Sequence, residues 1–152
     1  MNPSSFLLFL HKLFPAEAVF AHCDIPCGIY SVRPALIAAD TVIKMTERII
    51  SLPPVDERDN VQAQGFHNAI ARYVMAKEEY AQLCKKELLI LWTDYFKPEH
   101  TAVFPNLHET FWRAAKLCSR AKQEVSMDAA MQLKAAVEEI AEIFEKAHTA
   151  KQ

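Results

Sequence analysis

Glycine is scarce in this chain, whose 152 residues include only two. All-β folds need glycine at turns and bulges, and phosphate-binding loops are built from it, so the composition argues against both. The formal net charge is -2, and no strong basic field exists to hold nucleic acid. No apolar run reaches the roughly 18 to 20 residues of a membrane span, so no membrane-spanning segment is expected in the mature form.

The first 21 residues are predicted to be a cleavable leader. A short apolar run, Phe6 to Leu10, is followed by Val19-Phe20-Ala21, the small-x-small pattern after which signal-type peptidases cut. We expect a leader-processing protease to cut after Ala21, so that the mature domain covers 22–152 and begins at His22. The alternative is an amphipathic helix that stays attached.

The remainder of the chain predicts an all-α fold. Prolines separate segments whose apolar residues recur at the 3.6-residue period, and these predict helices at about 34–52, 56–96, 99–122 and 126–149. Four amphipathic helices with short connections favour an antiparallel up-down four-helix bundle. Lys77 falls on the apolar stripe of the second helix, which predicts a slight bend or a solvent-facing stretch there.

The four cysteines are of two kinds. Cys84 and Cys118 lie on the apolar stripes of the second and third helices, where a free cysteine usually behaves as a small hydrophobe. A disulfide between these two stays open at this point. Cys23 and Cys27 lie instead in a turn that contains proline and glycine, before the first helix.

The segment 22–30, "HCDIPCGIY", is called the hook below and is predicted to bind a metal ion. A C-x3-C pair beside a histidine suits zinc, copper or nickel, although the spacing alone equally fits a short disulfide loop. Cleavage before His22 adds a free α-amine. This amine, the backbone nitrogen of Cys23 and the thiolates of Cys23 and Cys27 would form an N2S2 plane, which favours nickel(II) or copper(II). The His22 imidazole could approach as an axial ligand when the metal is oxidised.

The hook resembles the nickel-binding segment HCDxPCGxY of the nickel-containing superoxide dismutases, which follows a cleaved leader. The segments "LWTDYFKPEH" (91–100) and "FPNLHE" (104–109) resemble two further stretches of that family. The resemblance implies a four-helix bundle assembled as a homohexamer with one nickel ion per subunit. It also implies disproportionation of superoxide to oxygen and hydrogen peroxide, with nickel cycling between its +2 and +3 states.

The resemblance also implies a role for each matching residue. The metal ligands would come from His22, Cys23 and Cys27, whereas Asp24, Pro26 and Gly28 would shape the hook. Two tyrosines would line the approach to nickel and a nearby lysine would attract the anion, namely Tyr30, Tyr95 and Lys97. For Tyr95 helix packing is a compatible second role, and for Lys97 the alternative is a solvated lysine at a helix end.

This chain departs from the family at the two positions that hold the axial imidazole. Ala38 stands where well-known members have a glutamate, and Tyr80 stands where they have an arginine. The orientation of His22 would therefore depend on another group, such as Asp40, Glu78, Glu79 or water.

Two other hypotheses compete with the enzyme. One is a non-catalytic nickel or copper carrier that uses the same hook, and the other is a structural bundle with a Cys23–Cys27 disulfide. A carrier has no need of tyrosines far along the chain, so the 91–100 segment favours the dismutase. Free thiolates and the absence of Lys or Arg before the apolar run favour the cytoplasm, with export as the alternative.

Overall fold

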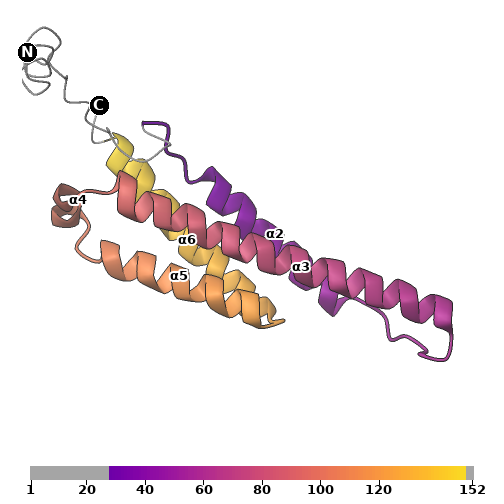
Figure 1. Cartoon of the computed structure of the whole chain (residues 1–152). Coiled ribbons are helices and arrows are strands. Elements are labelled where there is room, and N and C mark those ends of the chain that lie inside the picture. Colours follow the sequence, from indigo (N-terminus) through magenta and orange to yellow (C-terminus); the bar gives the residue numbers. More distant parts are fainter. Residues whose placement is uncertain (1–27, 150–152) are drawn as a thin grey trace, which may run out of the picture.

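The computed structural model describes residues 28–149, which form helices with no strand among them. Four long helices make up the body of the molecule: α2 (Arg33–Ile50), α3 (Asn60–Ile90), α5 (Leu107–Gln123) and α6 (Met127–Thr149). α3 packs against α2 and α5, and α6 packs against the same two helices. Successive long helices run in opposite directions (Figure 1), so the predicted antiparallel up-down bundle is confirmed.

The core of the bundle combines small and large side chains. α2 contributes alanines with no exposed surface, including Ala35, Ala38 and Ala39, which let its backbone approach its neighbours closely. Larger fully buried residues fill the space between the other helices, among them Leu88, Phe111, Leu133 and Ile140. Within residues 28–149, no helix is long and apolar enough to cross a membrane.

Several helix ends differ from the predicted bounds, and proline explains two of them. The predicted helix at 99–122 is divided into α4 (Pro98–Val103) and α5, because Phe104 leaves the helical region with φ −121° and ψ 79°. Phe104 precedes Pro105, and the proline ring disfavours helical geometry in the residue before it. For the same reason α2 ends at Ile50, before Leu52 and the Pro53–Pro54 pair.

The second long helix begins later than predicted and changes its winding near its end. Asp59 caps α3, since its carboxylate accepts the backbone N–H groups of Val61 and Gln62 at 3.0 and 3.2 Å. After Ile90 the chain continues as the π-helix η1 (Leu91–Tyr95). Here the N–H of Phe96 donates to the carbonyl of Leu91 at 3.1 Å, a bond that spans five residues.

Lys77 corrects the expectation of a bend or a solvent-facing stretch in α3. Its side chain is 1 % exposed, within the bundle. The ammonium donates to the backbone carbonyls of Ala121, Lys122 and Glu124 at 2.7, 2.7 and 3.0 Å. These carbonyls end α5 and have no partner within their own helix, so Lys77 closes the C-terminus of α5 from the neighbouring helix.

Candidate metal centre

The predicted metal ligands lie outside the described residues. Ala21, His22, Cys23, Asp24, Pro26 and Cys27 all precede Gly28, the first residue that the structure describes. The structure therefore describes only the end of the hook, from Gly28, and the helices beside it.

Gly28, two residues before the end of the hook, has a backbone conformation that favours glycine. Its φ is +76°, in the left-handed region that side chains rarely adopt. A Cβ built at Gly28 would meet no atom within 4 Å, so the backbone angle rather than lack of space explains the residue. The chain then enters α2, where the Ser31 hydroxyl accepts the N–H of Arg33 at 3.2 Å and buried Val32 anchors the segment.

The two predicted approach tyrosines lie together. The ring of Tyr30, the last residue of the hook, meets the ring of Tyr95 edge-on at a centroid distance of 5.6 Å. Tyr95 comes from η1, so the π-helix brings a residue 65 positions further along the chain to the end of the hook. A hollow of about 80 Å³ lies beside this contact, lined by Ile29, Tyr30, Ser31, Pro34, Glu87, Ile90 and Leu91.

Aromatic rings surround Tyr95, which is 7 % exposed. Phe96 and Phe144 lie 4.9 and 4.6 Å from it, and the imidazole of His100 stacks against it at 5.9 Å. The Nδ1 atom of His100 accepts the backbone N–H of Lys97 at 2.8 Å, which fixes the orientation of that imidazole. His100 was not among the predicted site residues, although it belongs to the 91–100 segment that carries the resemblance.

Burial of Tyr95 predicts a loss of stability in alkali. Its surroundings raise the pKa of the phenol, first through desolvation and then through the negative charge of Glu145. A phenol with a raised folded-state pKa contributes stability that is complete below its unfolded pKa of about 10 and is lost as the pH rises through the folded value. Urea unfolding between pH 8 and 11 should show a steeper decline above about pH 10 for the native chain than for Tyr95→Phe. Equal slopes for the two proteins would contradict this assignment.

The structure also describes the predicted lysine, the two positions where the chain departs from the family, and one of the acidic residues suggested as a partner for His22. Lys97 is exposed and occupies the N-cap position of α4, two residues after Tyr95. Ala38 is fully buried and Tyr80 is half-buried, packed against the core. Asp40 forms an ion pair with Lys134 of α6 at 2.8 Å.

Two acidic residues offered as partners for His22 lie on the exposed side of α3. Glu78 and Glu79 are both exposed, next to buried Lys77. Lys77 stands at the C-terminal end of α5, whereas Tyr30 lines a hollow with Ile90 and Leu91 at the other end of α3. Neither glutamate is therefore placed beside the end of the hook.

Cys84 and Cys118 are buried free thiols, as their helical stripes predicted. The Cys84 thiol lies 3.6 Å from the carbonyl oxygen of Ala35. A hydrogen bond with Cys118 and burial raise the pKa of the Cys84 thiol far above its ordinary value. Both cysteines therefore act as core side chains, and the disulfide between them is not present.

A second contact near η1 was not predicted from the sequence. The indole N–H of Trp92 donates to Nδ1 of His108 at 2.8 Å, and the indole stacks on Phe111 at 5.9 Å. These contacts fasten the π-helix to α5. Trp92 belongs to the segment 91–100 and His108 to the segment 104–109, the two stretches of the bundle that resemble the family. That shared resemblance was the signal in the sequence from which a contact between them could have been predicted.

Comparison with known proteins identifies the family. The family model for nickel-containing superoxide dismutase matches residues 17–148. The chain belongs to the nickel-containing superoxide dismutase family. It is therefore a superoxide dismutase, an oxidoreductase with a nickel cofactor.

Individual relatives agree with this assignment. A superoxide dismutase [Ni] of Streptomyces seoulensis is 38% identical over 114 residues, which cover 74% of this chain and 78% of the relative. The Streptomyces coelicolor protein of the same name is 36% identical over the same shares. A native nickel superoxide dismutase structure superposes with a TM-score of 0.70 at 30% identity, covering 84% of this chain and 99% of that one.

The donor groups of this nickel superoxide dismutase suit the metal. The predicted donors of the hook are two thiolates, an imidazole and the α-amine that cleavage would free, and all are soft or borderline donors of the kind that nickel accepts. Gly28 has a left-handed backbone conformation, and two residues later Tyr30 lies against Tyr95. The residues present therefore fit a nickel ion at the hook.

Proposed function

We propose that the nickel ion of this dismutase is held by His22, Cys23 and Cys27, and that superoxide reaches it past Tyr30 and Tyr95. The observation that carries the proposal is the ring contact between these tyrosines, at 5.6 Å. It joins the end of the hook to the second segment that resembles the family. When bound, nickel supplies the redox chemistry by passing one electron from a first superoxide to a second.

The chain's own residues would control access and protons. The second superoxide leaves as hydrogen peroxide and takes up two protons, so the site needs ordered water or hydroxyl groups. The phenols of Tyr30 and Tyr95 would order that water and keep the approach narrow, which also protects the thiolates from peroxide. Lys97 would attract the anionic substrate, because it is exposed two residues after Tyr95.

Maturation would complete the ligand set. A protease that removes residues 1–21 would free the α-amine of His22, and Asp24 and Pro26 would shape the turn that brings the donors together. The mature domain would then cover 22–152. We place the protein in the cytoplasm, because the thiolates must stay reduced and Cys84 and Cys118 are free.

The proposal extends to a homohexamer with one nickel ion per subunit. Large apolar side chains on the long helices support self-association, since Ile37 and Ile50 are each more than half exposed.

The composition of the matured protein tests the metal site. We expect protein processed by its native protease to begin at His22 and to contain one nickel ion per chain, as measured by mass spectrometry and by elemental analysis. The unprocessed chain should bind nickel weakly and lack full activity. Full activity with residues 1–21 still attached would contradict the role of the α-amine.

A further inference from the structure

Half of α3 extends past the end of the four-helix body. Lys77 contacts the last carbonyls of α5, so the preceding residues 60–76 lie beyond that helix. These 17 residues of α3, called the overhang below, span about 25 Å at 1.5 Å per residue. Figure 1 shows α3 and the α2–α3 connection projecting past α5 and α6. Within the overhang the structure buries Ala63 alone, whereas residues 77–90 bury Lys77, Ala81, Cys84 and Leu88.

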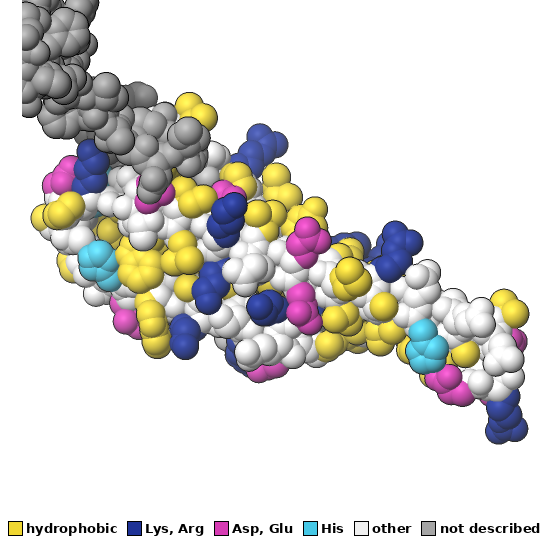
Figure 2. Space-filling model, viewed as in Figure 1, with side chains coloured by type: hydrophobic (Ala, Val, Ile, Leu, Met, Phe, Trp, Pro, Cys, Tyr) yellow, Lys and Arg dark blue, Asp and Glu magenta, His cyan; other side chains and the backbone are white. Residues whose placement is uncertain are grey.

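The overhang has the composition of a protein interface. Among Asp, Glu, Lys and Arg, the overhang contains only Arg72, whereas the shorter stretch 77–90 contains six such residues. Val61 and Met75 are 81% and 70% exposed, and four larger apolar residues are half-buried, namely Phe66, Ile70, Tyr73 and Val74. Depletion of charge together with aromatic residues and methionine distinguishes the centre of an interface from ordinary surface. In Figure 2 the projecting end of the molecule, which includes the overhang, shows few charged side chains before the tip formed by the α2–α3 connection.

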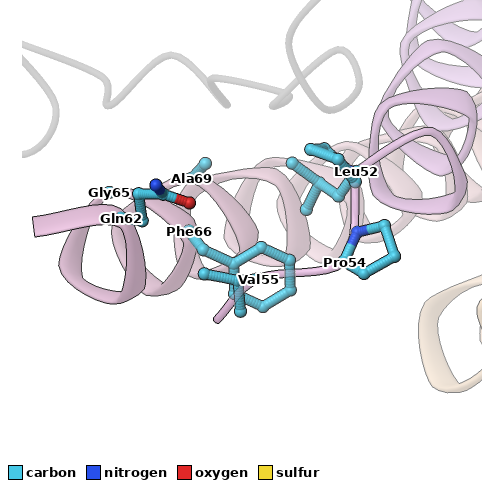
Figure 3. A pocket seen from close by; sticks show the side chains of 8 residues that line it. Leu52, Pro54, Val55, Gln62, Gly65, Phe66 and Ala69 are labelled. Atoms are coloured by element: carbon cyan, nitrogen blue, oxygen red, sulfur yellow. The ribbon is translucent and has the colours of Figure 1, made fainter. Parts of the chain in front are cut away.

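A groove runs between the overhang on one side and the last turns of α2 with the connection after it on the other. One hollow of about 310 Å³ is bounded by Leu52 to Val55 on one side and by Gln62, Gly65, Phe66 and Ala69 on the other. Figure 3 shows Phe66 and Val55 lying against one another within it. A second hollow, of about 380 Å³, lies between Met45 and the stretch of α3 that includes Ala69, Arg72 and Tyr73. Because both include Ala69, they follow one face of α3.

Gly65 lies in this face, in the first half of the overhang. Glycine inside a helix is less favourable than alanine, by about 1 kcal/mol. A Cβ built at Gly65 meets no atom within 4 Å, so nothing in this chain requires the smaller residue. Close approach of another backbone would account for it.

We propose that the overhang pairs with the overhang of a second copy of this chain, antiparallel and about a two-fold axis near Gly65. The charges favour a second copy over another protein. The connection between α2 and α3 has an acidic tip, because Asp56, Glu57 and Asp59 outnumber Arg58 and all four are exposed. Within the chain Asp56 lies 3.8 Å from Arg58, and Glu57 lies 3.2 Å from His67 of the overhang. Arg72 lies about as far beyond Gly65 in the sequence as this tip lies before it. An antiparallel pair therefore places each Arg72 beside the acidic tip of the partner subunit. A two-fold contact buries the same apolar face twice, and two such hairpins together form a further four-helix layer.

The leader of the same chain is a poorer occupant. The described chain begins beside Ile90 and Leu91, whereas the groove lies at the other end of α3. The inference rests on the self-association included in the proposed function, and it adds the surface and the symmetry.

The mass of the assembly tests the pairing, measured by light scattering on the full chain over a range of concentrations. Gly65→Leu should fold normally, because space at Gly65 is open and leucine favours helix, but it should block the close approach. Met75→Glu places a charge on the same helix. We expect each variant to lower the mass at least twofold while the helical circular dichroism stays unchanged. The control is Met131→Glu on α6, where methionine is also exposed (54%), and it should keep the wild-type mass.

Four outcomes would overturn the pairing. Unchanged mass in both overhang variants would place the interface elsewhere, and so would dissociation by Met131→Glu alone. Association that appears only after removal of residues 1–21 would make the leader the occupant. A wild-type monomer at every concentration would overturn both the pairing and the proposed hexamer. The metal site is judged separately, by nickel content, so its failure is distinguishable from failure of the interface.

Discussion

Replacing Cys27 by serine is expected to abolish nickel binding and superoxide dismutation. A serine hydroxyl stays protonated at neutral pH and is a hard oxygen donor, so it does not replace a thiolate in the metal plane. Changes to groups that only support metal ligands commonly lower metal affinity or activity 10- to 100-fold. Loss of a ligand itself should therefore lower the activity at least about a thousandfold. The measurements are nickel per chain and the rate of superoxide decay in protein that has been processed to His22.

Cys118→Ser provides the matched control within the same chain. Cys118 is a free thiol inside the bundle, far along the sequence from the hook. Its replacement buries a hydroxyl and should lower the free energy of unfolding by about 1–3 kcal/mol, while the folded fraction keeps its nickel. The proposed ligand set would be wrong if Cys27→Ser retained one nickel ion per chain, or if both variants lost nickel equally while folded.

The bundle could be predicted because helical patterns are local in the sequence, whereas the metal ligands of the hook stay a prediction. Helical periodicity depends on neighbours three and four residues apart, and it identified the long helices and the buried positions of Cys84 and Cys118. The hook's chemistry likewise depends on a few adjacent residues. The pairing of Tyr30 with Tyr95 followed from the family resemblance, and the structure supplies the contact itself.

The remaining features depend on contacts that local patterns do not encode. The π-helix shifts the register of Tyr95 by one residue, and its contacts reach α5 through Trp92 and His108. Lys77 is buried because the carbonyls at the end of α5 meet it, and those lie 44 to 47 residues further along the chain. A lysine on an apolar stripe indicates such a partner without saying which one. The consequence of Ala38 and Tyr80 for His22 likewise depends on the hook's packing.

Lys77→Met is expected to lower the stability of the bundle by several times more than a change at an exposed lysine. The ammonium has three N–H donors and uses them on three carbonyls, at 2.7, 2.7 and 3.0 Å. Methionine has a similar length and is apolar, so the core stays filled while these carbonyls lose their partner. Burial lowers the pKa of Lys77, against a smaller opposing effect of Glu78, so removing the charge also recovers part of its desolvation cost.

These opposing terms set the expected size of the effect. The Ala121 carbonyl is buried and pays the full cost of an unsatisfied acceptor, whereas the Lys122 and Glu124 carbonyls can turn to water. The net loss should be about 3 kcal/mol in the free energy of unfolding, measured with urea on metal-free protein at one concentration. Lys86→Met, at an exposed position on the same helix, should change that free energy by less than about 0.5 kcal/mol. Equal values for the two variants would mean that water satisfies the end of α5 as well as Lys77 does.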